Sequence, residues 1–121
     1  MTQPAETEEV RTIIGAYGAA VRSGDLDAYI SLFHQDAIQG GPGRPPAIGR
    51  QAIRDRIAPV LRGNPTFLID PEQIDVAGEI AVVIAHPESS GERPSNLTAM
   101  FVLRRESDRW RIWRQIVTPR S

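Results

Sequence analysis

The chain has 121 residues, 40% of them hydrophobic and 24% charged, so it can form one domain with a core and is too apolar for disorder. Its formal net charge of −1 gives no electrostatic reason to expect nucleic acid or an anionic membrane as a partner. Cysteine is absent and all fourteen basic residues are arginine, which excludes disulfides, thiol nucleophiles and Schiff-base lysine chemistry.

Three helices are predicted in the N-terminal half, after a flexible tail at residues 1–6. The first opens at Thr7 and ends at Ser23-Gly24, where glycine adopts the left-handed conformation that stops a helix. Asp25 caps the second helix, and the third begins after Gly49. Apolar residues at helical spacing are Val10, Ile13, Ile14, Tyr17, Ala20 and Val21, then Leu26, Tyr29, Ile30 and Phe33, then Ile53, Ile57, Val60 and Leu61.

Strands are predicted mainly in the second half. Residues 37–39 form a short strand that leads into a glycine- and proline-rich surface loop at 39–46. After the third helix, β-branched and alternating segments predict strands at residues 66–70, 73–77, 79–86, 96–105 and 109–118. Helices followed by a meander of antiparallel strands indicate an α+β fold rather than a doubly wound sheet.

Three segments resemble one known superfamily. Residues 23–37 are similar to the second-helix signature of the nuclear transport factor 2-like superfamily, residues 46–53 to its entry into helix three, and residues 108–112 to its last hairpin. Within that superfamily the chain looks most like the small bacterial SnoaL-like and SgcJ/EcaC-like proteins. The fold carries enzymes, binding proteins and oligomerisation modules alike, so the resemblance does not decide the function.

The resemblance implies an architecture and a partner. Residues 1–121 would form a single domain in which three N-terminal helices pack in a strongly curved, mostly antiparallel sheet, a cone-shaped α+β barrel with a pocket at its open end. Such proteins commonly form homodimers through the outer face of the sheet, so a homodimer of this kind is expected.

Ketosteroid isomerases, on the same fold, use a helix-one tyrosine as an oxyanion donor together with a carboxylate base and a protonated aspartate. Counted from Gly24, the resemblance places Tyr17 at the tyrosine position. The base position falls at Gly41 or Gly40, and the second acid falls near Phe101. Two of the three groups are therefore missing, and steroid isomerase chemistry is not expected.

Limonene epoxide hydrolases, on the same fold, provide a second template for comparison, in which an Asp-Arg-Asp set activates water. Asp70, Arg54 and Asp55 are available for such a set. Nothing in the sequence places the three side chains together.

The resemblance also turns one face of each strand toward the pocket. In the run 79–86 this is the face of Val82, Ile84 and His86, although His86 could instead lie half in solvent at the strand end. On the last strand Trp113, Gln115 and Val117 share one face, while Trp110, Ile112, Arg114 and Ile116 share the other. Apolarity alone buries the second set. The resemblance points Trp113 and Gln115 at the pocket and leaves Trp110, Ile112 and Ile116 for a dimer interface.

The preferred hypothesis is a protein that binds a small, largely apolar, polycyclic or aromatic molecule and needs no cofactor. Isomerisation, cyclisation or dehydration by proton transfer fits this pocket, with His86 as base and Tyr17 as donor. The candidate ligand contacts are Phe33, Gln39, Ile84, Phe101, Trp113 and Gln115. The alternative is a non-catalytic ligand-binding or dimerisation domain, in which the Tyr17 hydroxyl, the His86 ring and the Gln115 amide do not converge on one open cavity.

Two further expectations concern metals and location. His34 and His86 lie in no metal-binding spacing, and His34 is expected to be solvated at the end of the second helix, so no metal site is expected. No apolar run approaches the roughly 20 residues that span a bilayer, and the acidic start does not resemble a secretory signal. A cytoplasmic location without membrane contact is therefore expected.

Overall fold

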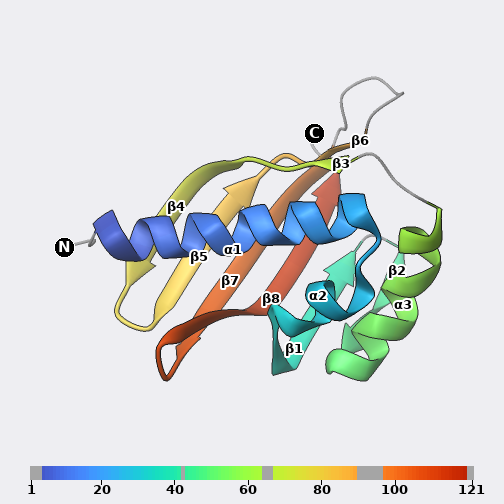
Figure 1. Ribbon diagram of the computed structural model, residues 1–121, viewed down its shortest axis with the longest axis horizontal. Coiled ribbons are helices and arrows are strands. Elements are labelled where there is room, and N and C mark those ends of the chain that lie inside the picture. Colours follow the sequence, from blue (N-terminus) through green and yellow to red (C-terminus); the bar gives the residue numbers. More distant parts are fainter. Residues whose placement is uncertain (1–3, 42, 64–66, 90–96, 120–121) are drawn as a thin grey trace.

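The structure is a computed structural model that describes residues 4–41, 43–63, 67–89 and 97–119. Its helices are α1 (Pro4–Ser23), α2 (Leu26–Ser31) and α3 (Arg50–Arg62). Its strands are β1 (Phe33–Gly41), β2 (Arg44–Ile48), β3 (Phe67–Leu68), β4 (Pro71–Ala77), β5 (Ile80–Ala85), β6 (Glu88–Ser89), β7 (Leu97–Glu106) and β8 (Arg109–Pro119). Figure 1 labels these elements.

Local sequence signals, a turn glycine and a capping aspartate, set the boundary between α1 and α2. Gly24 has a φ of 69°, which lets the chain turn tightly between α1 and α2. The Asp25 side chain accepts a hydrogen bond from the Ala28 backbone N–H at 3.0 Å and so caps α2. Three predictions of element bounds are wrong: α1 begins at Pro4 rather than Thr7, Phe33 is the first residue of β1 rather than part of α2, and β1 spans Phe33–Gly41 rather than only residues 37–39.

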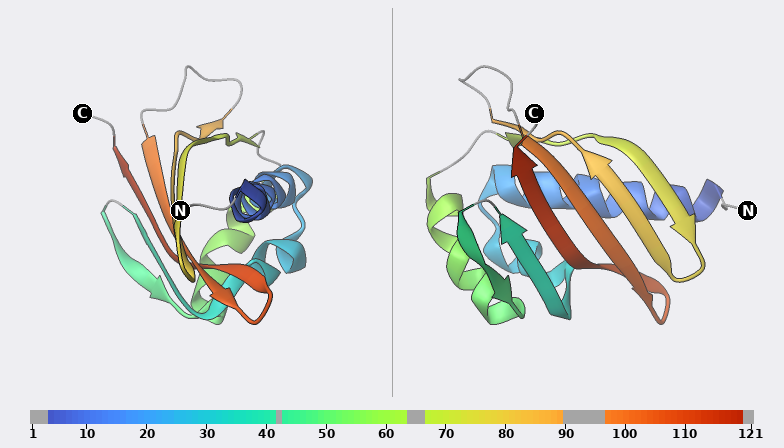
Figure 2. Two further views of the ribbon diagram at one scale, coloured as in Figure 1. Left: turned by 90° about the vertical axis from the view of Figure 1, so that its left-hand side faces the viewer. Right: turned by 180° about the vertical axis from the view of Figure 1, so that it is seen from behind.

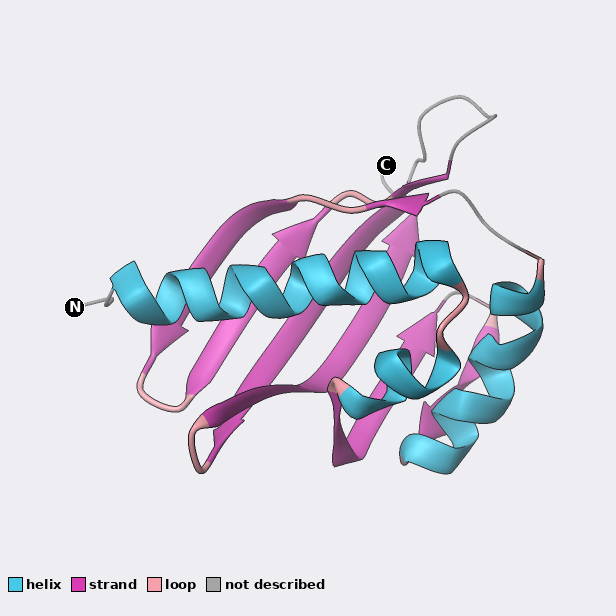
Figure 3. Ribbon diagram, viewed as in Figure 1, coloured by secondary structure: helices cyan, strands magenta, loops and turns pink. Residues whose placement is uncertain are grey.

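Six strands form one sheet in the order β2-β1-β8-β7-β5-β4, and β3 pairs with β6 in a separate two-stranded sheet. Within the six-stranded sheet, β1 pairs with β8 in parallel, and every other neighbouring pair of strands is antiparallel. All three helices lie on one side of this sheet (Figure 3), and the sheet bends around that side (Figure 2). The α+β fold with three helices and an open sheet is therefore confirmed.

The core lies between the helices and the concave face of the sheet. Its largest fully buried side chains are Tyr29, Phe33, Phe101, Ile14, Ile53, Leu103, Ile112, Val10 and Val83. The apolar stripe predicted on the first helix supplies Val10, Ile14, Tyr17, Ala20 and Val21 to this core. Tyr17 lies over the middle of the sheet, where its ring packs on Phe101 of β7 and its hydroxyl contacts Gln115 of β8.

The segment 39–46, apart from residue 42, which lies outside the described residues, is not the surface loop that its glycines and prolines predict. It is the end of an antiparallel hairpin in which Gly41 of β1 pairs with Arg44 of β2. The prolines of β2 are tolerated because β2 is the edge strand, where one side of the backbone needs no partner. The ends predicted for the strands at 66–70 and 96–105 fall partly on residues 64–66 and 90–96, which lie outside the described residues.

None of the described helices combines the length and the apolar character needed to cross a bilayer.

Candidate functional site

A cavity of about 260 Å³ opens at the end of the sheet where α3 lies beside β1 and β2. Side chains and backbone from six elements line it: Tyr17, Tyr29, Gln39, Gly40, Gly41, Arg44, Arg56, Ile57, Val60, Gln115 and Val117. We refer to this cavity as the mouth pocket. Figure 1 shows α3 in front of the β1–β2 hairpin at this end of the molecule.

Four buried polar side chains form the floor of the mouth pocket. Gln115 donates from Nε2 to the Tyr17 hydroxyl at 2.8 Å, and the Tyr29 hydroxyl donates to the Tyr17 hydroxyl at 3.4 Å. Gln39 donates from Nε2 to Gln115 Oε1 at 2.8 Å and to the Tyr29 hydroxyl at 3.0 Å. Among the described residues, no buried side-chain nitrogen or oxygen is left without a hydrogen-bond partner. The floor is therefore a connected network, which holds each group in place.

The fold brings these four residues together from distant parts of the sequence. Gln39 and Gln115 are direct neighbours across the parallel β1–β8 pair. The Tyr17 ring lies 5.1 Å from the Tyr29 ring and 5.2 Å from the Phe101 ring, centroid to centroid. These ring contacts orient the two hydroxyls toward the glutamine amides.

Burial controls the proton affinity of the two tyrosines. Desolvation raises the pKa of Tyr17 above its ordinary value, and hydrogen bonds from Tyr29 and Gln115 oppose part of that rise. Desolvation also raises the pKa of Tyr29 well above its ordinary value, with the neighbouring Tyr17 adding to the effect. Both hydroxyls are therefore neutral at physiological pH, where they can donate hydrogen bonds but cannot act as bases.

Phe33 and Phe101 are placed behind the floor rather than along the walls. Both are fully buried, and neither lines the mouth pocket. Phe33 packs on Tyr29 with the ring centroids 5.1 Å apart, so the two phenylalanines support the tyrosine rings instead of facing a ligand. The prediction that they line the pocket is wrong because the tyrosines stand between them and the cavity.

A bulge in β8 decides which residues of the last strand face inward. Val102 pairs with Arg114 and the next residue, Leu103, pairs with Ile112, so Trp113 is an extra residue in β8. Consequently Ile112 and Gln115 are both buried on the concave side, although simple alternation puts them on opposite faces. Before the bulge the buried face is that of Trp110 and Ile112, and after the bulge it is that of Gln115 and Val117. Each of the two faces predicted from the sequence is therefore the inward one for half of the strand.

Trp113 itself does not face the mouth pocket. Its ring is covered by the Arg114 guanidinium at 4.0 Å and by the Arg104 guanidinium at 5.3 Å from the centroid. Trp110 and Ile112 are buried in the core, so they are unavailable for the dimer interface suggested for them. Both corrections follow from the extra residue in β8.

The structure also corrects the face expected for β5. Ala81, Val83 and Ala85 are fully buried on the helix side, which leaves Val82 and Ile84 on the opposite, partly covered side. Small side chains on the inner face leave room for α1, which crosses the sheet here (Figure 1). Ile84 therefore does not line the mouth pocket.

His86 lies away from the floor residues. Its Nε2 lies 2.6 Å from Glu72 Oε2, and its Nδ1 lies 3.3 Å from Thr98 Oγ1. It lines a separate hollow together with residues such as Ile69 and Asp70. The structure therefore brings Tyr17, Gln39 and Gln115 together and leaves His86 outside the group.

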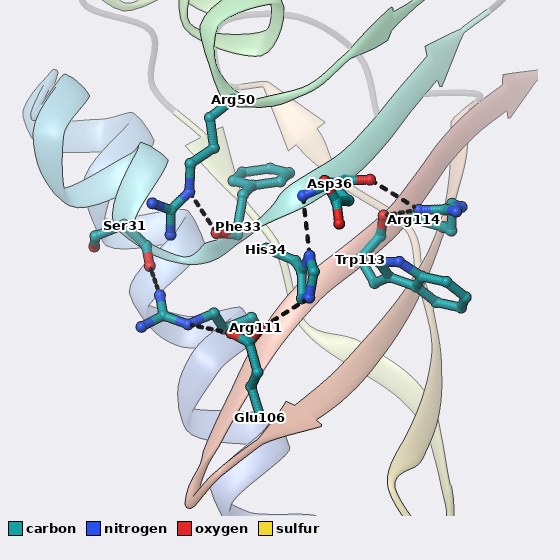
Figure 4. A network of polar contacts seen from close by, with 9 residues as sticks. All are labelled: Ser31, Phe33, His34, Asp36, Arg50, Glu106, Arg111, Trp113 and Arg114. Atoms are coloured by element: carbon teal, nitrogen blue, oxygen red, sulfur yellow. Dashed lines mark hydrogen bonds and ion pairs between the residues drawn. The ribbon is translucent and has the colours of Figure 1, made fainter.

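His34 is buried in β1, so the prediction of a solvated residue at the end of the second helix is wrong. Its Nδ1 accepts a hydrogen bond from the Asp36 backbone N–H at 2.9 Å, and its Nε2 lies 3.0 Å from Glu106 Oε2 (Figure 4). Glu106 also pairs with Arg111, which donates to the Ser31 carbonyl. This network fastens the β7–β8 hairpin to the end of α2, and no sequence pattern marks it because its members are far apart along the chain.

A larger hollow of about 530 Å³ lies between α1, the end of α2 and the β7–β8 turn. Its charged lining consists of Glu9, Arg50, Asp108, Arg109 and Arg111. Several of these groups are already engaged within the protein: Trp110 donates to Glu9, Arg50 donates to the Phe33 carbonyl, and Arg111 pairs with Glu106. We favour the smaller mouth pocket because its polar groups converge and it contains no opposing charges.

The Asp-Arg-Asp set is not assembled. Arg54 pairs with Asp27 on the surface, Asp55 accepts a hydrogen bond from Gln51, and Asp70 lies at the hollow beside His86. Within the part of the chain that the structure describes, no group of three or more His, Cys, Asp or Glu side chains could hold a metal ion.

Solved structures with the same architecture define the class of fold. A suggested dehydratase of the NTF2-like family from Streptomyces avermitilis superposes with a TM-score of 0.83 at 21% identity, covering 98% of both chains. An NTF2-like protein with a cystatin-like fold from Novosphingobium aromaticivorans gives 0.82 at 25% identity, covering 95% of this chain and 82% of that one. A ketosteroid isomerase-like protein from Erwinia carotovora gives 0.79 at 20% identity, covering 98% and 99%. The molecule has the nuclear transport factor 2-like fold.

The family follows from the sequence match. The family model of the SnoaL-like domain matches residues 10–117 of the sequence, and the chain belongs to that family. The epoxide hydrolase LasB from Streptomyces lasalocidi is 39% identical over 61 residues, which are 50% of this chain. The matched segment spans only 21% of the length of that enzyme.

Proposed function

We propose that the protein binds a small molecule in the mouth pocket without forming a covalent bond to it. The observation that supports this is the convergence of Tyr17, Tyr29, Gln39 and Gln115 on the floor of one cavity. Binding pockets commonly combine apolar walls with a few fixed polar groups that orient the ligand. Ile57, Val60 and Val117 supply such walls here.

The size of the pocket restricts the ligand. At about 260 Å³ the mouth pocket lies just below the range of about 300–1,000 Å³ that is usual for ligand pockets. A body of one or two rings therefore fits better than a steroid-sized one. An oxygen atom at the inner end of the ligand would exchange hydrogen bonds with the floor.

Proton transfer by Tyr17 and His86 is not part of this proposal. His86 is held by Glu72 outside the mouth pocket, and the described lining residues include neither a carboxylate nor a histidine. The two tyrosines remain neutral at physiological pH for the reason given above. The pocket thus contains hydrogen-bond donors but no base, and binding accounts for it better than acid–base catalysis.

The binding proposal is tested with 2-naphthol, a neutral two-ring phenol whose fluorescence reports its environment. We expect saturable binding to the protein, and we expect Tyr17→Phe to lower the affinity about three- to tenfold, the effect of one hydrogen bond. His86→Gln is the control and should bind as the unaltered protein does. Absence of saturable binding, or equal weakening by both substitutions, would overturn the proposal.

A second candidate is the opening of an epoxide, which the similarity to LasB favours. In hydrolysis, the oxygen of water bonds to an epoxide carbon while the carbon–oxygen bond breaks and a proton ends on the former epoxide oxygen. Hydrogen bonds from the floor could stabilise that oxygen as negative charge develops on it. Conversion of cyclohexene oxide to its diol, abolished or strongly reduced in Tyr17→Phe, would support this activity; no diol above the buffer rate would contradict it.

We also propose a homodimer formed through the convex face of the sheet. Cross-strand pairing puts Met100 and Ile116 side by side on that face, and they are 43% and 51% exposed. Ile48, paired with Ile38 on the same face, is 67% exposed. Neighbouring exposed apolar side chains on an uncovered sheet are typical of an interaction surface.

A further inference from the structure

We infer that the ligand of the mouth pocket is an anion, with its charged group held between Arg44 and Arg56. This inference rests on the proposed binding function and names the chemical class of the ligand. Both arginines line the cavity, from β2 and α3 respectively; Arg44 is exposed and Arg56 is half-buried, whereas the four floor side chains are buried. A ligand that fills the pocket would therefore place one end on the floor and the other beside two positive charges.

Arg56 is held in position without losing its charge. Its guanidinium donates to the Gln39 carbonyl at 3.4 Å and to the Pro45 carbonyl, both of which are neutral acceptors. A guanidinium has five N–H donors, so two bonds leave further donors for a ligand. The backbone contacts thus orient Arg56 in advance, which reduces the entropy cost of binding.

The Arg44 side chain makes no hydrogen bond or ion pair within the described part of the chain. Other arginines differ: Arg11, Arg54, Arg105 and Arg111 each pair with a carboxylate. The formal net charge of the whole protein is −1, whereas the described lining of the mouth pocket has two arginines and no acidic residue. This local excess of positive charge would attract an anion and would be reduced by binding it.

The backbone beside the arginines leaves space for an anionic group. Gly40 and Gly41 stand where the resemblance to ketosteroid isomerases implies a carboxylate base, and a carboxylate there would repel an anion. A Cβ atom at Gly41 would meet nothing within 4 Å, and one at Gly40 would meet only Ile116 at 3.9 Å. The absence of side chains at these positions therefore leaves the approach to Arg44 and Arg56 open.

The expected ligand class combines these features. A compact aromatic carboxylate would pack its ring against Ile57, Val60 and Val117 and present its two oxygens to the arginines. Planar guanidinium groups can hold a carboxylate through paired hydrogen bonds, which favours a carboxylate over a spherical anion of the same charge. A hydroxyl or carbonyl at the opposite end of the ring would contact the tyrosine and glutamine floor.

The test compares 2-naphthoate with 2-naphthol, which share a ring system and differ in charge at pH 7. We expect naphthoate to bind more tightly, and its affinity to fall as the salt concentration rises. Arg44→Gln and Arg56→Gln should each weaken naphthoate about three- to tenfold, and each should weaken naphthol by a smaller factor. Arg62→Gln is the matched control. Arg62 is an exposed residue of α3, the helix that also contains Arg56, and it does not line the pocket. Its substitution by glutamine changes the net charge by the same amount.

The outcomes separate this inference from the proposed function. If naphthol binds and depends on Tyr17, but naphthoate has no advantage or is insensitive to both arginine substitutions, the anion inference is wrong and the binding proposal stands. If neither probe binds the unaltered protein, both are wrong. Arg44→Gln removes no side-chain hydrogen bond or ion pair within the described structure, so its result does not depend on whether Arg56→Gln folds.

Discussion

Gln115 occupies a central place in the buried floor, because it accepts from Gln39 and donates to Tyr17. A buried amide costs free energy unless its donors and acceptor are satisfied. Here the hydrogen bond from Gln39 satisfies the acceptor of Gln115, and the tyrosine hydroxyls accept from both glutamines. The residues that would orient a ligand are thus the same residues whose hydrogen bonds offset the desolvation cost of burying the floor.

Replacing Gln115 with leucine should destabilise the protein. The Gln39 amide would lose an acceptor and Tyr17 a donor, and an unsatisfied buried polar group costs about 1–3 kcal/mol. The measurement is the free energy of unfolding in urea. Gln73→Leu is the control, since Gln73 is an exposed strand glutamine bonded to Asp75; a loss of similar size there would contradict this role of Gln115.

Alkaline pH should destabilise the protein through Tyr17 and Tyr29. Their folded pKa values lie above the unfolded value of 10.0, so below pH 10 both states hold these protons and no stability is lost. Above pH 10 the unfolded chain releases protons that the folded chain retains, and the free energy of unfolding falls by up to about 1.4 kcal/mol per pH unit per tyrosine.

The measurement is urea unfolding between pH 9 and 11. The chain contains two tyrosines, no lysine and no cysteine, so other side chains contribute little in this range. Tyr17→Phe should make the decline shallower. An identical slope in both proteins would show that burial of Tyr17 does not control it.

At the scale of single elements, α1 has two glycines in different surroundings. Gly15 is exposed, and a Cβ atom there would meet nothing within 4 Å. Gly18 is buried, and a Cβ atom there would lie 3.0 Å from Ile69 Cγ2 and 3.2 Å from Arg22 Nη1. The second glycine therefore allows α1 to approach the segment between β3 and β4.

Alanine at these two positions should have opposite effects. Gly15→Ala should stabilise the protein by about 0.5–1 kcal/mol, because alanine favours the helix. Gly18→Ala should lose that gain to the close contact with Ile69 and become less stable than the unaltered protein. Thermal unfolding of both variants is the measurement, and equal stabilisation would show that α1 does not need a glycine at position 18.

The strands show why alternation along a strand predicts the buried face less reliably than periodicity along a helix does. Alternation in β8 is interrupted at Trp113, and the pairing of β1 with β8 also shifts between Phe33 and Ile38. Each shift changes which side chains face the helices. Helix α1, whose periodicity needs no partner strand, was predicted correctly in its buried face.

At the scale of the whole molecule, the helices cover one face of the sheet and leave the other uncovered (Figure 2). The apolar residues Ile48, Met100 and Ile116 are exposed on this uncovered face. A second copy of the chain would bury them in a symmetric contact.

Ile116→Arg should therefore shift the protein toward the monomer. Burying an unpaired charge in an apolar interface is unfavourable, so sedimentation velocity should show loss of a dimer. Leu68→Arg is the control, because Leu68 is an equally apolar exposed residue on β3, outside the six-stranded sheet. A monomer in the unaltered protein at all concentrations would contradict the interface.

Local sequence determined the helices and the class of fold. The apolar stripe of α1, the cap at Asp25 and the turn at Gly24 depend on residues close in sequence, so they could be read without the structure. The succession of helices and strands likewise indicated α+β. Tyr17 was placed on the buried side of α1 by the same periodicity.

Only the tertiary structure decided which side chains form the candidate site. Gln39 and Gln115 are adjacent because β1 and β8 pair in parallel, and Gln115 faces inward because Trp113 is bulged. Trp113 is kept out of the mouth pocket by the register shift in β8, and His86, which follows the last residue of β5, lines a different hollow. Helix periodicity is a property of one segment, whereas strand register is a property of a pair, and a single sequence does not contain the pairing explicitly.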